Sequence, residues 1–269
     1  MRLVGRLATY LARLLAAIGS VFDRAAFIVN GFLPALLPPR DLTHLIRAHY
    51  ERSYIDTYAR FSNDLYEWTL EAWEEDVLLR HGIRSGNILV LGAGVGRESI
   101  ALAQQGLSVV GLDINREAVR TADCAAQRTK VSAAFVQADF LALPIRPHYF
   151  DYVLLSGIMY SSISGRAHRQ AWLKSLHAYL KDGGCIVLNF LVDRWPPTRS
   201  RRLVEAVNRL AVTLPGANKS YQPGDTCAQG HFLHAFQSED EIRQELLEAD
   251  ILVTDLAWRR GFAVVRFPP

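Results

Sequence analysis

Residues 88–115 read ILVLGAGVGRESIALAQQGLSVVGLDIN, and this stretch decides the fold. An apolar run ends in three alternating glycines, Gly92, Gly94 and Gly96, an amphipathic segment follows, and a second apolar run ends at Asp113. This order predicts a strand, a tight turn, a helix and a second strand with an acid at its tip. Glycines let the backbone approach a nucleotide closely, and an acid in this place accepts hydrogen bonds from ribose hydroxyls. The stretch therefore predicts a site for a cofactor that contains adenosine.

Composition limits the remaining possibilities. The chain has 269 residues, half of them hydrophobic, which is enough for one large core with an accessory segment. Its three cysteines, Cys124, Cys185 and Cys227, are far apart and form no pattern of zinc ligands. We therefore expect a reducing, cytoplasmic location and no metal. The net charge of +3 is too small to predict a nucleic-acid partner, although residues 1–50 hold six arginines against two acids.

Residues 1–45 form a separate N-terminal extension in this interpretation. From residue 3 to 22, apolar side chains recur at helical spacing, and Arg2, Arg6 and Arg13 fall on the opposite side. We discard a secretory signal, because Arg13 interrupts the apolar region, and a transmembrane span, because no run of about 18 apolar residues exists. Two alternatives stay open. The helix lies on the inner face of a membrane as a peripheral contact, or it packs on protein, as such helices more often do.

After Asp113 the pattern alternates helices with buried strands. We expect strands at residues 133–137, 152–155 and 185–190, with a helix that Asn115 caps after the second strand of the opening stretch. Such alternation predicts an α/β fold with a doubly wound, mainly parallel sheet.

The end of the chain predicts a capped helix followed by a hairpin. Ser238 and Glu241 form a capping box, and two strands, at residues 251–258 and 261–267, are joined by a short turn. Residues 190–236 interrupt the rhythm with an expected helix over residues 199–214 and a long loop over residues 215–230. Since long insertions are usually functional or disordered, we expect this one on the substrate side, forming a pocket together with the aromatic residues between 50 and 73.

The glycine turn separates two cofactor classes. A dinucleotide site requires a third glycine where this chain has Arg97, which weakens an NAD site. The order of elements over residues 75–267 resembles the class I S-adenosylmethionine-dependent methyltransferases. The resemblance implies a methyltransferase domain over residues 46–269, with a Rossmann-like, seven-stranded sheet whose C-terminal strand is antiparallel. It also implies S-adenosyl-L-methionine as the cofactor.

The same resemblance assigns cofactor contacts to particular residues. They are Gly92, Ala93, Gly94 and Gly96 in the turn beside the methionine part, Asp113 on the ribose, Ile114 against the adenine, Asp139 and Phe140 at the adenine edge, and Ser156 where cofactor and acceptor meet. One position departs from the family. Many members carry an acid where this chain has Val90.

Methyl transfer is an in-line displacement, so the protein mainly positions the acceptor and excludes water. A hydroxyl acceptor benefits from a general base, for which histidine is the usual choice. We single out His231 and His234 as catalytic candidates, although a histidine in such a segment is more often a surface or packing residue. Neither the choice between oxygen and nitrogen acceptors nor the oligomeric state follows from the sequence.

The leading hypothesis is a methyltransferase for a small-molecule acceptor that is hydrophobic or membrane-associated. The chain lacks the Asp-Pro-Pro-Tyr or Asn-Pro-Pro-Tyr motif of DNA base methyltransferases and any visible RNA-binding module, which disfavours nucleic acid. Two alternatives are kept. One is an NAD-dependent oxidoreductase, and the other is a non-catalytic scaffold that retains the fold and binds a membrane or a partner.

Overall fold

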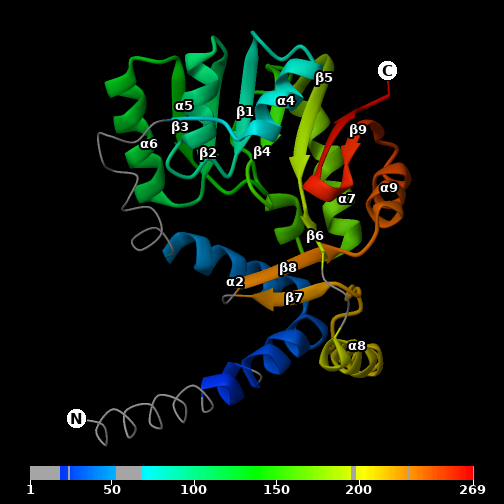
Figure 1. Ribbon diagram of the computed structural model, residues 1–269. Coiled ribbons are helices and arrows are strands. Elements are labelled where there is room, and N and C mark those ends of the chain that lie inside the picture. Colours follow the sequence, from blue (N-terminus) through cyan, green and yellow to red (C-terminus); the bar gives the residue numbers. More distant parts are fainter. Residues whose placement is uncertain (1–18, 24, 53–67, 195–197, 229–230, 269) are drawn as a thin grey trace, which may run out of the picture.

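A seven-stranded sheet forms the centre of the computed structural model (Figure 1). The structure describes residues 19–23, 25–52, 68–194, 198–228 and 231–268. In spatial order the strands are β3 (Ala133–Gln137), β2 (Ser108–Asp113), β1 (Asn87–Leu91), β4 (Phe150–Leu155), β5 (Leu180–Asn189), β10 (Phe262–Arg266) and β9 (Leu252–Ala257). The first five strands pair in parallel, and β10 is antiparallel to both of its neighbours. The predicted doubly wound sheet with an antiparallel C-terminal strand is confirmed.

Helices cover both faces of this sheet. The helices are α4 (Ala72–Arg80), α5 (Arg97–Gln104), α6 (Arg116–Thr129), α7 (Arg166–Ser175) and α9 (Glu239–Glu248). Successive residues of β1 point to opposite faces, so Leu89 joins the core under α7 and α9, while Ile88 joins the core under α4 and α5. Burial on both faces explains why the strands read as continuous apolar runs.

Strand β5 differs from its expected form. The sequence predicts a turn at Asp182, Gly183 and Gly184 before a strand that starts at Cys185, whereas β5 begins at Leu180. Phe150 of β4 pairs with Leu180, and Tyr152 pairs with Cys185, so the extra residues form an irregularity within the strand. Gly183 has φ 76°, a conformation that favours glycine.

The insertion contains a second, smaller sheet that the sequence did not predict. Strand β6 (Leu191–Val192) directly follows β5, and β8 (His231–Phe236) lies between β6 and β7 (Asp225–Ala228). We expected a long loop over residues 215–230, and part of it is instead β7. The insertion helix α8 (Arg199–Ala211) is confirmed, with Thr198 as its N-cap.

Helix α2 (Pro39–Arg52) packs on the small sheet. Leu42 and Ile46 share an apolar cluster with Cys227 and Phe232. In Figure 1, α2 lies between the large sheet above it and the helical residues 25–36 below it. The helix also crosses the boundary expected between residues 45 and 46, and the division into an extension and a catalytic domain stays a prediction.

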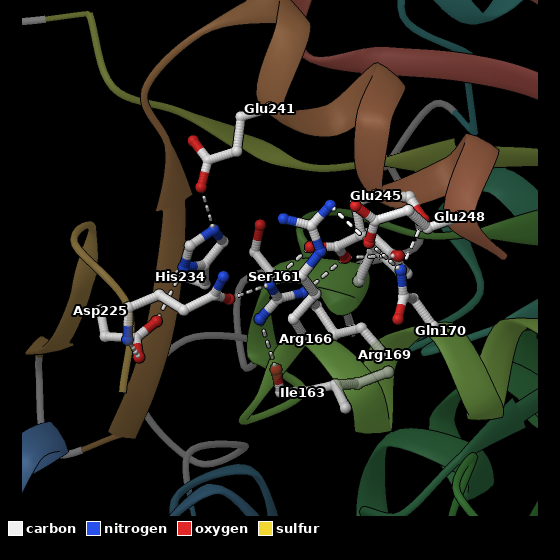
Figure 2. Close-up of polar contacts among 12 residues, drawn as sticks. Ser161, Ile163, Arg166, Arg169, Gln170, Asp225, His234, Glu241, Glu245 and Glu248 are labelled. Carbon is white, nitrogen blue, oxygen red and sulfur yellow. Dashed lines mark hydrogen bonds and ion pairs between the residues drawn. The ribbon is translucent and has the colours of Figure 1, made fainter. Parts of the chain in front are cut away.

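A fully buried ion pair joins α7 to α9 (Figure 2). Arg169 donates from Nε and Nη2 to the two carboxylate oxygens of Glu245, both at 2.8 Å, and both side chains have 0% exposure. Tyr160 donates its hydroxyl to the same carboxylate, and the Arg169 guanidinium also reaches Gln222. Because this network satisfies the buried charges, it fixes how α7, α9 and the insertion pack together.

Loss of one partner from this pair should be costly. We predict that Glu245→Ala lowers the free energy of unfolding by about 3–5 kcal/mol, because Arg169 stays buried without its counter-charge. The matched control is Glu239→Ala, which removes an exposed pair with Arg243 on the same helix and should cost less than about 1 kcal/mol. Urea unfolding followed by circular dichroism measures both, and equal costs would contradict the prediction.

Candidate active site

A cavity of about 530 Å³ opens at the carboxyl ends of the central parallel strands. This volume suits a small-molecule site. In open α/β sheets, ligands bind at this edge, where the strand order reverses. The wall consists of the ends of β1 and β2, the segments that follow β2, β3 and β4, and one side of α2 and α7. These contribute Thr43, Ile46, Arg47, Tyr50, Gly92, Leu112, Asp113, Ile114, Asn115, Ala138, Asp139, Phe140, Leu141, Ser156, Gly157, Ile158, Met159, Ser162, Ile163, Ser164, His168, Ala171, Trp172 and Ser175.

Gly92 of the glycine turn lines this cavity, whereas Ala93, Gly94 and Gly96 are not among the lining residues. The backbone N–H groups of Gly92 and Ala93 donate to the carbonyl of Leu112 at 2.8 and 2.9 Å, which holds the turn against β2. Gly96 has φ 91°, and a Cβ there would lie 2.9 Å from the ring of Phe135. The positive φ and the lack of space for a Cβ both require glycine at this position.

Asp113 ties this turn to the end of β2. Its carboxylate accepts N–H bonds from Gly94 and Asn115, both at 2.8 Å, and the side chain lines the cavity. Burial raises the pKa of Asp113, while the backbone bonds from Asn115 and Gly94 oppose that shift. A carboxylate held in this way is preorganised to accept hydrogen bonds from hydroxyl groups of a ligand.

The side of the cavity that Asp139 lines carries an ion pair that the sequence did not predict. Asp139, Phe140 and Ile114 all line the cavity, and their assigned contacts with adenine stay a prediction. Arg47 of α2 donates from Nε to Asp139 at 2.7 Å, so the helix is fastened to the acid assigned to the adenine edge. No pattern in the sequence marked Arg47, because it belongs to a distant helix whose position depends on the insertion.

Ser156 stands at the end of β4 and is held by a buried acid. Its hydroxyl donates to Glu98 at 2.6 Å, and Glu98 also accepts from Arg97. Burial raises the pKa of Glu98, and Arg97 and Ser156 act against that shift. Val90 belongs to the apolar core under α4 and α5. Position 90 therefore supplies no acid to the site. Glu98 is a different acid, and it orients the cavity residue Ser156.

Arg97 has a structural role at the position where a dinucleotide site has its third glycine. Its two terminal nitrogens donate to the two carboxylate oxygens of Glu74 at 2.8 and 2.7 Å. This bidentate pair joins the start of α5 to α4. Arg97 therefore binds a neighbouring helix at the position where a dinucleotide site needs a glycine for close packing. This agrees with the sequence evidence against an NAD site.

The two predicted catalytic histidines lie outside the cavity wall. His231 stacks on His49 of α2 with ring centroids 4.1 Å apart. His234 is fully buried between Asp225, at 2.7 Å, and Glu241, at 3.3 Å (Figure 2). Burial and Arg169 act to lower the pKa of His234, but the bonds to the two acids outweigh them and raise it. A catalytic role for either histidine stays a prediction.

A third histidine, His168, lines the cavity among the residues described. It lies in the first turn of α7, and its Nδ1 is 3.1 Å from the carbonyl of Ser164. A carbonyl oxygen only accepts, so Nδ1 carries the hydrogen and Nε2 is the acceptor in the neutral ring. Sequence reasoning missed this residue, because nothing in the helix pattern marks the side of α7 that faces the ligand.

Comparisons with known proteins agree with this geometry. Residues 88–184 match the family described as "Methyltransferase domain", and the match spans the glycine turn, Asp113, Asp139 and Ser156. Residues 88–184 therefore form a methyltransferase domain. The enzyme uses S-adenosylmethionine, and the NAD-dependent alternative is not supported. No curated protein matches the chain.

Solved structures show the same methyltransferase fold at low identity. A methyltransferase from Methanosarcina mazei is 22% identical, with a TM-score of 0.51, and the match covers 74% of this chain and 98% of that one. One from Clostridium acetobutylicum is 13% identical, with a TM-score of 0.53, and the match covers 84% and 100%. The 1,6-didemethyltoxoflavin-N1-methyltransferase of Burkholderia thailandensis, with bound S-adenosylhomocysteine, is 18% identical, with a TM-score of 0.57 and coverage of 86% and 88%.

Asp113 should dominate binding of the cofactor. We predict that Asp113→Ala weakens the affinity for S-adenosylhomocysteine by roughly 10- to 100-fold, because hydrogen bonds to a charged group contribute about 1.5–3 kcal/mol. The matched control is Asp151→Ala, which removes an aspartate that also accepts a backbone N–H, from Asn87, but lies outside the cavity wall. Isothermal titration calorimetry measures both affinities, and an equal loss in the control would contradict the assignment.

Proposed function

We propose that this methyltransferase transfers the methyl group of S-adenosylmethionine to an oxygen or nitrogen atom of a small, largely apolar molecule. The observation that carries the proposal is the extent of the cavity. It continues past the cofactor residues, between α2 and α7, along a wall that includes Ile46, Met159, Ile163 and Trp172. Apolar walls with a few polar groups are typical of small-molecule sites.

The polar groups on this wall lie close together in the chain. Ser162 and Ser164 precede α7, and His168 and Ser175 lie on it. Together they offer hydroxyls and one imidazole to an otherwise apolar ligand, which orients the acceptor atom. Trp172 donates its indole N–H to the carbonyl of Phe140 at 2.9 Å, so the acceptor wall is fixed to the predicted adenine side.

The chemistry requires mainly position and exclusion of water. S-adenosylmethionine supplies an electrophilic methyl group when it is bound. The chain's part is to hold the cofactor at the glycine turn and Asp113, and to cover the cavity with α2. For a hydroxyl acceptor, Nε2 of His168 would accept the proton that the hydroxyl loses. An amine that arrives neutral needs no such base.

His231 and His234 enter this proposal as positioning residues. His231 packs against His49 and Tyr50 at the end of α2, which covers the cavity. His234 joins Asp225 of β7 to Glu241 of α9 (Figure 2). Both support the insertion on which α2 rests, so we infer that their loss affects acceptor binding more than the reaction step.

Direct detection of product tests the proposal. Enzyme incubated with S-adenosylmethionine carrying a deuterated methyl group and an organic-solvent extract should yield a labelled small molecule in mass spectra. An aqueous extract should yield less, because the acceptor wall is largely apolar. Asp113→Ala serves as the inactive control. No labelled product from either extract, despite binding of the cofactor, would favour the non-catalytic scaffold.

His168 distinguishes the two acceptor classes. With a hydroxyl acceptor, His168→Gln should lower kcat by about 10²–10⁴-fold while KM changes little, because general-base catalysis contributes that much. With an amine acceptor, kcat should change little. His177→Gln, at an exposed position beside Phe267, is the matched control. A full rate for the hydroxyl reaction in His168→Gln would remove the base from the mechanism.

Peripheral contact with the inner face of a membrane through residues 1–45 also remains a proposal, as does the cytoplasmic location. The residues of the amphipathic, arginine-faced segment up to 18 lie outside those described. Within the part of the chain that the structure describes, no helix is both long and apolar enough to cross a bilayer.

A further inference from the structure

We propose that the helical residues 25–36 and helix α8 together form a surface that docks on an anionic lipid bilayer. We call this pair the docking platform. It lies at the bottom of Figure 1, beyond the small sheet and away from the large one. The inference concerns a surface outside the cavity, and it does not depend on which acceptor the enzyme uses.

The two helices of the platform pack directly on each other and are joined by hydrogen bonds. At Gly31 a Cβ would lie 2.7 Å from a methyl group of Val204, so the helices cross closely where a side chain is missing. Asn208 of α8 is fully buried and donates to the carbonyl of Gly31 at 2.8 Å. The amide of Asn218 donates to the carbonyl of Pro34 at 2.8 Å and its backbone N–H to that of Ala35 at 2.9 Å. These bonds satisfy the free carbonyls at the end of the first helix.

Helix α8 exposes an apolar stripe on the side away from this contact. Leu203 and Leu210 are 66% and 72% exposed, and Val207 and Leu214 are 39% and 55% exposed. Spacings of four and three residues place Leu203, Val207 and Leu210 on one face of α8, and Leu214 follows the end of the helix. Val204 and Asn208, which hold the helix to the protein, are buried. A stable fold does not require leucines on the outer face, so their presence calls for a partner.

The first helix repeats this arrangement. Ile28, Val29 and Leu36 are 42%, 56% and 49% exposed, and their spacing places them on one face. The two segments, with Phe27, hold seven of the fourteen large hydrophobic side chains that are exposed in the described residues, and Val21, Phe22 and Leu214 lie just outside their ends. Such concentration at one end of the molecule is unlike the scattered exposed apolar residues of an ordinary surface.

Charge identifies the partner as an anionic surface. Residues 198–219 hold five basic residues against one acid, Glu205, which is paired with Arg201. Arg199, Arg202 and Arg209 are exposed beside the stripe. Basic residues that flank a strongly apolar stripe are the pattern of a helix that lies in the headgroup region of a bilayer. Each arginine near an anionic membrane surface contributes about 1 kcal/mol of attraction, or roughly fivefold in binding.

The platform is also connected to the cavity by the chain itself. Residues 25–36 lead, through a short segment with Pro38, directly into α2, which covers the cavity and holds Asp139 through Arg47. A bilayer on the platform would therefore lie on the outer side of the element that covers the site. This is the arrangement expected of an enzyme that receives an apolar acceptor from a membrane.

Vesicle flotation of the full chain tests the inference. We expect the wild type to float with vesicles of phosphatidylcholine containing phosphatidylglycerol, more weakly without the anionic lipid, and more weakly as salt increases. The double change Leu203→Glu with Leu210→Glu should reduce the bound fraction at least tenfold, because it places charges in the apolar stripe. The charge reversals Arg202→Glu and Arg209→Glu should abolish the preference for anionic lipid.

Two exposed leucines elsewhere give a matched control. Leu79 of α4 and Leu247 of α9 are 63% and 72% exposed, close to the values for Leu203 and Leu210. Changing both to glutamate adds the same charge and should leave flotation unchanged. Titration with S-adenosylhomocysteine shows that each variant is folded.

Unchanged flotation of the platform variant would overturn the inference, even if residues 1–18 bind the vesicles by themselves. No flotation of the wild type, with a dimer that the platform variant dissociates in sedimentation, would instead identify a second copy as the partner.

Discussion

The carboxylate of Asp113 is the constraint on which the site depends. It ends β2 and accepts hydrogen bonds from Gly94, in the turn after β1, and from Asn115, at the start of α6. A single half-buried acid thereby fixes three segments relative to one another. Burial raises its pKa and the backbone bonds lower it, so the carboxylate is stabilised by the same contacts that shape the turn. Substituting it would alter both the turn and the group that meets the ligand.

The second determinant is the way α2 is held over the cavity. Asn115 caps α6 with its side-chain oxygen and donates its amide to the carbonyls of Tyr50 and Glu51 at the end of α2. Arg47 of α2 binds Asp139, and the small sheet supports the opposite side of the helix. The insertion therefore acts on the site through α2. No residue of the insertion is among those that line the cavity in the described part of the chain.

Short sequence patterns predicted the elements whose conformation depends on residues close together in the chain. The strand that ends at Leu91, the glycine turn, the cap at Asn115 and the C-terminal hairpin are each encoded by neighbouring residues, and all are confirmed. Contacts between distant segments could not be predicted in this way. Arg47, His168 and Glu98 gain their places from the packing of α2, α7 and the end of β4, which no short pattern records. The small sheet was missed because its strands are short and β6 directly follows another strand. The aromatic residues between 53 and 67, expected near the cavity, lie outside those described.

Parallel calorimetric titrations with S-adenosylhomocysteine and NAD test the central claim most directly. The claim is that the glycine turn, Asp113 and the Asp139 edge form one site for a sulfonium cofactor and its product. We predict that S-adenosylhomocysteine binds with one molecule per chain and that NAD gives no heat, because Arg97 is engaged with Glu74 where a dinucleotide site requires glycine. Binding of NAD without binding of S-adenosylhomocysteine would contradict the account.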